Sequence, residues 1–467
     1  MTSSAHLDVI VIGAGLSGLR AATELHAAGI SYVVLEANDR VGGKTLSVPV
    51  NSDGTAFVDM GAAWINDSNQ SEMFTLSKEF GFDLVVQKAE GRSLYQDAEG
   101  NVKTIPFGLP ADLSEEQLAE MQSIIAKFKG YVERTDIENP HLGSDAEELD
   151  SLTALEFANK VFGGSLAGLL VTTLTRALLG VEADELSALF LVDYIKSGTG
   201  LDNISSDGKD GGQYMRNRQG NERFSTKLCE KLRNGSVKLN SPVVDVIQSD
   251  EGCTVKTLDS REYHAKKVIV SIPTSLYSRV NFKPGLPHAK KELGESTELG
   301  YFSKIVLLFE EAWWRDADLL GIFTSLDGPI SFTRDTSVPE DGQYSITCFM
   351  VGQPGRDWSR LSPKDRRDVV LKQFRAASSA AVDRVPEPIN IIEKDWSKDH
   401  WFQGGPSPVM KPGVMTGAGK AIRDPFQNIH FVGTETSLVW KGYMEGAVRS
   451  GTRGAREVLE ALNRTSS

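Results

Sequence analysis

The stretch "LDVIVIGAGLSGLRAATELHAAGISYVVLEANDRVGGK", residues 7–44, decides the fold of this chain. It opens with an apolar run that is typical of a strand buried on both faces of a parallel sheet. Gly13, Gly15 and Gly18 then form a G-x-G-x-x-G turn ahead of an amphipathic helix. A second apolar strand follows and ends at Glu36. This order of elements predicts an α/β (α+β) fold with a Rossmann-like domain that binds a dinucleotide.

The three glycines and the carboxylate suit different parts of an adenine dinucleotide. Gly13 permits the sharp turn, Gly15 lets the backbone approach a pyrophosphate, and Gly18 lets the helix lie close to the strand. The free N–H groups at the start of the helix favour phosphates. Glu36 stands where a carboxylate can accept hydrogen bonds from ribose hydroxyls. An acidic residue at this position disfavours NADP, but the turn alone leaves NAD and FAD open.

The residues that follow the second strand resemble FAD-dependent proteins, and this resemblance favours FAD over NAD. "EANDRVGGK", residues 36–44, is similar to a segment of FAD-dependent oxidoreductases of the glutathione reductase type. The resemblance implies that Ala37 and Gly43 contact FAD and that Arg40 pairs with a phosphate. Most of these proteins have Arg at the next position, whereas this chain has Lys44, which is a point charge and not a planar fork.

A second segment of small residues, "DMGAAWI" at residues 59–65, resembles the part of the same proteins that runs beside the flavin ring. The resemblance implies that Gly61 and Ala62 bind the cofactor. The alternative is a buried strand end without a ligand. The resemblance of residues 59–65, together with that of residues 36–44, leads us to expect FAD as the cofactor.

The composition favours a protein inside the cell and argues against several classes of partner. The chain has 467 residues, more than one hydrophobic core usually supports, which predicts two domains. Its net charge of −13 argues against nucleic acid or an anionic membrane as partner. Cys229, Cys253 and Cys348 are far apart, so we predict neither a disulfide framework nor a metal site. We find no signal peptide and no run of roughly 18 apolar residues, and we expect a cytoplasmic protein.

Strand-rich and helix-rich stretches alternate along the chain. Residues 109–135 and 151–180 have apolar residues at helical spacing, and Ser114 is the predicted N-cap of the first helix. Residues 237–270 alternate between apolar and polar positions and predict a β-meander. Residues 429–433 predict a last strand that ends in glycine and leads into a helix.

We therefore predict one FAD-binding domain that is assembled from three pieces, residues 1–84, 215–292 and 398–467. Residues 85–214 and 293–397 form a second domain that binds the substrate. A single glycine turn can hold only the adenosine diphosphate end of FAD. A distant part of the chain must therefore reach the flavin.

The C-terminal stretch "GTETSLVWKGYMEGAVRSG", residues 433–451, is the predicted second contact with the cofactor. We expect Gly433 and Thr434 to approach the ribityl chain and the flavin ring. A helix that begins near Met444 would direct its N–H groups at the pyrimidine edge of the ring. These groups would stabilise the negative charge that collects there on reduction.

Four stretches, "VKLNSPVVDV", "GYFSKIVLLFEEAWW", "EKDWSKDHWFQGGP" and "FVGTETSLVWKGYMEGAVRSG", resemble the flavin monoamine oxidase family in order and rough spacing. The resemblance covers nearly the whole chain. It implies oxidation of a primary amine by FAD and O2, with an aldehyde or ketone, ammonia and hydrogen peroxide as products. The C-terminal membrane helix of the mammalian members is missing here, so we expect no membrane partner and a monomer or homodimer.

Five residues acquire roles from this resemblance. Val243 corresponds to the residue whose backbone meets the adenine. Lys304 corresponds to the lysine that holds a water against flavin N5, although a lysine directed outward from an edge strand is the alternative. Tyr443 is one wall of an aromatic cage that orients the amine. Gln213 corresponds to a polar pocket residue, and Trp396 to an aromatic residue near the flavin that packing alone would also explain. Lys304 and Tyr443 are the candidate catalytic residues.

Two departures from the family change the expected site. Mammalian members attach the flavin through a Cys where this chain has Pro406, so we predict non-covalent FAD. The next residue, usually the second aromatic of the cage, is Ser407, which predicts a roomier site with Ser407 at its wall. Such a site is compatible with a bulky or long aliphatic amine of the fumonisin type. Leu178 and Leu179 are candidates for the entrance, although leucines at this spacing usually belong to a core.

Three alternative functions stay open from the sequence. A polyamine oxidase would need acidic side chains in its pocket. An L-amino-acid oxidase would need a basic side chain for the substrate carboxylate, which Arg176 or Arg216 could supply. In a non-enzymatic protein the flavin would be structural, and amines would leave it oxidised in the absence of oxygen.

Overall fold

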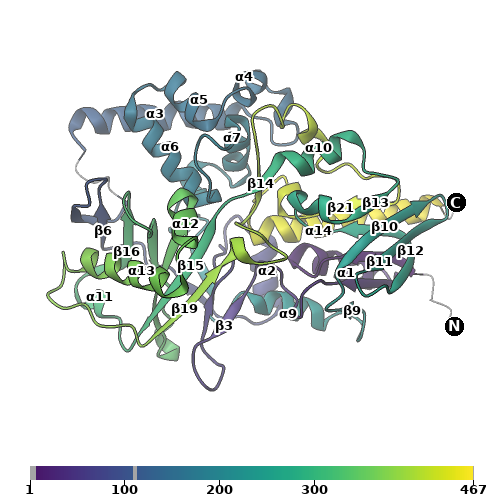
Figure 1. Ribbon diagram of the computed structural model, residues 1–467, viewed down its shortest axis with the longest axis horizontal. Helices are drawn as coiled ribbons and strands as arrows, with labels where there is room; N and C mark the ends of the chain where they lie inside the picture. Colours follow the sequence, from purple (N-terminus) through teal and green to yellow (C-terminus); the bar gives the residue numbers. More distant parts are fainter. Residues whose placement is uncertain (1–6, 109–112, 466–467) are drawn as a thin grey trace.

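The computed structural model describes residues 7–108 and 113–465. Two large β-sheets lie on opposite sides of the molecule, and a layer of helices covers one end (Figure 1). The first sheet has eight strands in the order β13-β10-β11-β12-β1-β2-β9, and β21 also pairs with β12. Its strands are β1 (Leu7–Ile12), β2 (Tyr32–Leu35), β9 (Val237–Lys238), β10 (Val243–Ser249), β11 (Gly252–Thr257), β12 (Glu262–Val270), β13 (Asn281–Lys283) and β21 (Ile429–Phe431).

The centre of this sheet is parallel and buried on both faces. β1 pairs in parallel with β2 and β12, and β21 pairs in parallel with β12. Val9 and Val11 pack with helices α1 (Leu16–Ala27) and α14 (Met444–Thr465), whereas Ile10 packs in the core on the opposite face. Side chains alternate between the two faces of a strand, and here both faces are covered, which explains the uninterrupted apolar run.

Helices α1 and α14 join the two ends of the chain. They lie side by side over the first sheet (Figure 1). Their contact is close at Gly451, because a Cβ there would collide with the backbone oxygen of Ser17. Arg20 also donates through Nε to the hydroxyl of Thr452 at 3.0 Å. The C-terminal helix is thus fixed beside the first glycine turn.

The predicted meander is present in part. β10, β11 and β12 are antiparallel neighbours, as the alternating pattern indicates. The prediction is wrong for residues 237–239, because β9 pairs in parallel with β2 at the opposite edge of the sheet. A period of two residues identifies a strand but does not identify its partner.

The second sheet has seven strands in the order β19-β15-β18-β17-β16-β6-β7. They are β6 (Arg92–Gln96), β7 (Val102–Pro106), β15 (Phe302–Phe309), β16 (Leu319–Ser325), β17 (Phe332–Asp335), β18 (Tyr344–Val351) and β19 (Asn390–Asp395). Helices α11 (Trp313–Asp316), α12 (Gly352–Ser359) and α13 (Pro363–Ser378) contribute to its core. All seven strands come from the two segments assigned above to substrate binding, and the first sheet comes from the other three. We keep this division as the proposed domain arrangement.

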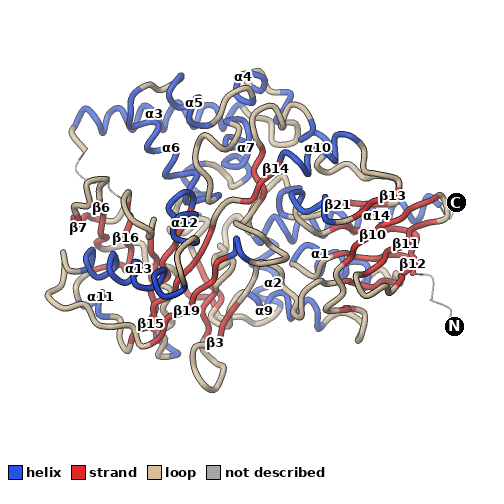
Figure 2. Tube along the Cα trace, viewed as in Figure 1, coloured by secondary structure: helices blue, strands red, loops and turns tan. Residues whose placement is uncertain are grey.

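The helical layer comprises α3 (Glu115–Arg134), α4 (Ala146–Asp150), α5 (Ala154–Val161), α6 (Gly164–Leu179) and α7 (Ala188–Ser197), at the top of Figure 2. Ser114 caps α3 as predicted, with Gln117 N–H donating to its hydroxyl at 3.2 Å. The predicted helix 151–180 is two helices, α5 and α6. Residues 109–112, where the first helix was expected to begin, lie outside the described residues. In the described part of the chain, no helix is both long and apolar enough to cross a membrane.

Small elements connect the two halves. They are α2 (Ser71–Glu79), α8 (Leu201–Ile204), α9 (Glu222–Glu230), α10 (His288–Ser296) and the strand pairs β3 (Ser47–Pro49) with β4 (Phe57–Asp59), β5 (Leu84–Val86) with β8 (Met215–Asn217), and β14 (Thr297–Leu299) with β20 (Pro408–Met410).

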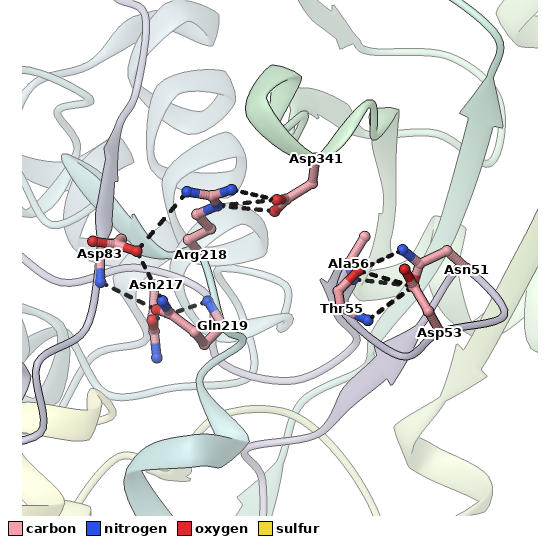
Figure 3. Close-up of polar contacts among 9 residues, drawn as sticks. All are labelled: Asn51, Asp53, Thr55, Ala56, Asp83, Asn217, Arg218, Gln219 and Asp341. Atoms are coloured by element: carbon pink, nitrogen blue, oxygen red, sulfur yellow. Dashed lines mark hydrogen bonds and ion pairs between the residues drawn. The ribbon is translucent and has the colours of Figure 1, made fainter.

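After β8, Arg218 binds Asp341 through Nε and Nη2 and approaches Asp83 (Figure 3). The β3–β4 turn is closed by Asn51, whose Oδ1 accepts from the N–H groups of Thr55 and Ala56 (Figure 3).

Candidate active site

One cavity of about 830 Å³ extends from the first sheet to the second. At one end it is lined by residues that follow parallel strands, including Gly13, Glu36, Ser271 and Gly433. Ligands of open α/β sheets bind at this carboxyl edge. At the other end it is lined by residues of β15, β18 and α6.

The glycine turn lets the protein backbone approach a ligand closely. Gly13 has φ +98°, which favours glycine, and a Cβ there would lie 2.9 Å from Ser271 O. At Gly18 a Cβ would collide with the backbone oxygen of Gly13, so this glycine permits the close packing of α1 on β1. Gly15 immediately precedes α1 and lines the cavity. Gly61 and Ala62 also line the cavity. The turn at Gly13 and Gly15 and the start of α1 fit the diphosphate of FAD.

Glu36 is fixed at the end of β2. Its Oε2 accepts from Ala14 N–H at 2.6 Å and its Oε1 accepts from Asn38 N–H at 2.8 Å. Burial raises the pKa of the Glu36 carboxyl, and these backbone donors oppose the shift. Ser241 N–H donates to Glu36 O at 2.7 Å, which brings the loop before Val243 to the same place. Glu36, Ala37 and Val243 all line the cavity, as an adenosine site requires.

Arg40 supports the loop that carries the second pair of glycines. Its Nη1 donates to Thr45 O at 2.9 Å and its Nη2 donates to Gly43 O at 2.7 Å. It also faces Glu222 at 3.5 Å, and it does not line the cavity. These contacts hold the loop in place, and the phosphate contact of Arg40 stays a prediction.

Lys44 and Gly43 line the cavity beside this loop. Lys44 donates through Nζ to the backbone oxygen of Gly405. Burial lowers the pKa of Lys44 to about 8, and the carboxylates of Glu435 and Asp399 oppose this shift. The lysine therefore links the first glycine segment to the Gly404–Gly405–Pro406 segment, which also lines the cavity.

The C-terminal segment reaches the same cavity, as predicted. Gly433, Thr434 and Met444 all line it, and α14 begins at Met444. Gly433 N–H donates to the Ser450 hydroxyl at 3.1 Å, and the Thr434 hydroxyl donates to Tyr443 O at 2.8 Å. The start of α14 can therefore supply N–H groups to a bound flavin.

Lys304 lies on a central strand. β15 is paired on both sides, with β18 and β19, so the outward-directed lysine of an edge strand is excluded. Its side chain is buried and lines the cavity, and Nζ donates to Asp59 O at 3.0 Å and to Gly61 O at 2.5 Å. Burial lowers the pKa of Lys304 to about 8, and Asp59 opposes the shift.

Tyr443 and Gln213 come together at the cavity. Both line it, and the Gln213 side chain interacts with the Tyr443 hydroxyl, which opposes the effect of burial on its pKa. The Trp440 ring lies edge-on to Tyr443, with centroids 4.7 Å apart. Burial raises the pKa of Tyr443, so this phenol stays neutral. Gln213 is further fixed by a hydrogen bond from Nε2 to Ile204 O at 3.3 Å.

Trp396 and Ser407 differ in their relation to the cavity. Trp396 lines it and donates through Nε1 to Met60 O at 2.8 Å. Ser407 is buried and is not a lining residue, whereas Pro406 and Pro408 line the cavity. The structure therefore gives no support for Ser407 as a wall of the amine site.

An aromatic cluster at the second sheet was not predicted from the sequence. Phe332 and Phe349 are stacked with centroids 4.5 Å apart, and Trp64 lies 6.0 Å from Phe349. Phe302 contacts Phe349 edge-on at 5.8 Å, and all four rings line the cavity. The Lys304 Nζ is 5.1 Å from the Phe349 centroid. Trp64 lies in the predicted flavin segment and Phe302 in a stretch that resembles the family, whereas Phe332 and Phe349 gave no signal in the sequence.

The basic residues considered for a carboxylate site are already bound. Arg176 lines the cavity but forms a bidentate ion pair with Glu182. Arg216 donates to the backbone oxygens of Thr336 and Ser337, both at 2.8 Å. Leu178 lines the cavity, whereas Leu179 is in the core (0% exposed) and is not a lining residue.

Comparisons with known proteins agree with this geometry. A family model described as flavin containing amine oxidoreductase matches residues 16–459. Amine oxidase [flavin-containing] A of Canis lupus familiaris is 32% identical over 98% of this chain and 86% of its own length. The probable flavin-containing monoamine oxidase A of Dictyostelium discoideum is 29% identical, covering 97% of this chain and 98% of that protein.

Solved structures show the same relationship. Cyclohexylamine oxidase from Brevibacterium oxydans IH-35A superposes with a TM-score of 0.90 at 26% identity, over 98% of this chain and 100% of that chain. Putrescine oxidase with bound putrescine gives a TM-score of 0.89 at 26% identity, over 97% of this chain and 99% of that chain. The chain therefore belongs to the flavin-containing amine oxidoreductase family. It is a flavin-containing amine oxidase whose cofactor is FAD, which confirms the predicted family, fold class and enzyme class.

Proposed function

We propose that the protein oxidises primary monoamines with an apolar body to aldehydes or ketones, with release of ammonia and hydrogen peroxide. One observation carries the choice of substrate class. Among the described residues that line the cavity, the only side-chain carboxylates are Glu36 and Glu435, and both lie in segments assigned to the cofactor. The cavity wall at the second sheet is aromatic, which suits an apolar substrate body.

The residues of this chain position the substrate. Bound FAD supplies the redox chemistry, because it accepts the equivalent of a hydride from the carbon that bears the amine and passes the electrons to oxygen. The negative face of the Tyr443 ring suits the amine nitrogen. The Lys304 Nζ has three protons. Two are used by Asp59 O and Gly61 O, which leaves one donor for a group in the cavity.

We also propose that FAD is held without a covalent bond. Pro406 stands where a covalent link would need a thiol, and it lines the cavity. None of the lining residues in the described part of the chain is a Cys or a His. The glycine turn, the α1 N-terminus and the loops around Lys44 and Gly433 would then hold the cofactor.

The substrate class predicts discrimination between matched amines. Hexylamine should be oxidised with a kcat/KM at least about 100-fold higher than hexamethylenediamine, because a second ammonium would be buried without a counter-charge. Peroxide release measures both rates, with 2-phenylethylamine and phenylalanine as a second matched pair. Phenylalanine should not be oxidised, since the arginines that line the cavity near the aromatic wall, Arg176 and Arg334, are paired with Glu182 and Asp207. Equal or faster oxidation of the diamine would instead identify a diamine oxidase.

A further inference from the structure

The turn that carries Tyr443 has an unusual backbone. Trp440 has φ +56°, a conformation that is uncommon for a residue with a bulky side chain. Gly442 has φ +80°, and a Cβ there would collide with the hydroxyl of Tyr194. Strained backbone of this kind persists where the surrounding structure determines it, and it gathers at functional sites.

Hydrogen bonds dock this turn on the end of α7. Trp440 N–H donates to Ser197 O at 2.8 Å, and Lys441 N–H donates to the Ser197 hydroxyl at 3.2 Å. The indole N–H of Trp440 donates to Asn69 O at 3.0 Å. The turn is therefore held on two sides by segments more than two hundred residues away in sequence.

A buried ion pair completes this attachment. The Lys441 ammonium binds Asp193, which lies one helical turn before Ser197 on α7. The side chain of Lys441 is 13% exposed and that of Asp193 is 1% exposed. In the described part of the chain, the second carboxylate oxygen of Asp193 has no hydrogen-bond partner, so Lys441 is the cation that binds this group directly, with the positive charge of Arg423 as a further electrostatic contribution. Removing one member would leave the other charge buried and unpaired.

The attached turn bears directly on the amine site. Tyr443 N–H donates to Trp440 O at 3.2 Å, and the two rings are in edge contact. Tyr194, the neighbour of Asp193 on α7, lines the cavity, and its ring centroid is 6.5 Å from that of Tyr443. Neither Lys441 nor Asp193 lines the cavity.

We propose that the Lys441–Asp193 ion pair positions Tyr443 for the amine, by fixing the 440–443 turn to helix α7. Both members are positioning residues and not catalytic residues, because they act through Trp440 and Tyr443. The inference rests on the proposed role of Tyr443 as a wall of the amine site.

The test compares K441M with K441R by anaerobic stopped-flow spectroscopy with hexylamine. K441M should lower the limiting rate of flavin reduction by about 10- to 100-fold, the effect of misplacing a positioning group. The FAD content and the concentration of amine at half-saturation should change little, by less than about threefold. K441R retains the ion pair and should keep the limiting rate within about threefold of the wild type.

Two further variants separate positioning from folding. The double variant D193L/K441M removes both charges and should recover the melting temperature lost in K441M, because an apolar pair can replace a buried ion pair. Its rate of flavin reduction should stay low, because two apolar side chains at positions 193 and 441 form no hydrogen bond that fixes the turn to α7. K411M, which breaks the exposed Lys411–Glu298 ion pair, should leave the melting temperature and the rate of flavin reduction unchanged.

The results distinguish the two proposals. A K441M variant that is reduced at the wild-type rate, or a double variant that recovers both stability and rate, would overturn the positioning role. If hexylamine and the other amines fail to reduce the wild-type flavin, the proposed function itself is wrong.

Discussion

Replacing Lys304 by methionine is expected to lower kcat for hexylamine by about 100-fold or more, the usual effect of removing one donor from a reacting site. Methionine keeps much of the apolar stem but cannot donate. The variant also leaves Asp59 O and Gly61 O without the ammonium that binds them. Peroxide release under saturating amine measures the loss, after the FAD content of the variant has been matched to the wild type.

Lys267 provides the matched control for this variant. It is also buried, lies on β12 of the first sheet and donates to Asn428 Oδ1 at 2.8 Å, away from the cavity. K267M should therefore retain the wild-type kcat within about threefold, as expected for a buried polar contact outside the site. Equal losses in K304M and K267M would mean that any buried lysine matters for folding, and the role of Lys304 in the site would be rejected.

Lys304 should also make the reaction of the reduced enzyme with oxygen depend on pH. Burial lowers the pKa of Lys304 to about 8 from its ordinary value of 10.5, so the ammonium loses its proton as the pH rises through this region. A positive charge at the site favours the negative charge that develops as oxygen is reduced. Reoxidation of the reduced wild-type enzyme should slow as the pH rises through about 8. K304M should lack this transition.

Replacing Tyr443 by alanine is expected to lower the rate of flavin reduction by about 100-fold, because the amine loses the surface that orients it. The Tyr443 ring packs against the rings of Trp440 and Tyr194, so it has a defined position at the cavity. Anaerobic mixing with hexylamine measures the reduction rate directly, without the reaction with oxygen.

Phenylalanine at position 443 is the matched control for alanine. Y443F keeps the aromatic face and removes only the hydroxyl, which interacts with Gln213. The reduction rate should fall by about 2- to 10-fold, the usual value of one neutral hydrogen bond. If Y443A is reduced as fast as Y443F, the aromatic face has no part in orienting the amine.

Much of the cofactor half could be predicted from the sequence because its signals are local. The turn at Gly13, the carboxylate of Glu36 and the helix that begins at Met444 each depend on a few consecutive residues whose backbone must approach a ligand closely. Lys304 was recognisable because a lone lysine in an apolar strand needs a partner. The structure supplies that partner in the backbone oxygens of Asp59 and Gly61.

The sequence was less informative where tertiary neighbours decide the outcome. The loop contacts of Arg40 could not be foreseen, because its partners are the carbonyl oxygens of its own folded loop. The burial of Ser407 away from the cavity could not be read from the sequence, because its neighbours Pro406 and Pro408 both line the cavity. Phe332 and Phe349 were missed because strand residues that line a cavity have the same apolar pattern as core residues.

The central claim is that segments far apart in this chain enclose one FAD without a covalent bond. The most direct test is to measure the FAD that acid precipitation releases from the purified protein. We predict a yellow protein that releases about one FAD per chain into the supernatant and leaves a colourless pellet, as expected for a cofactor bound only by non-covalent contacts. A colourless protein that stays colourless when FAD is added, or a pellet that keeps the yellow colour, would contradict the account.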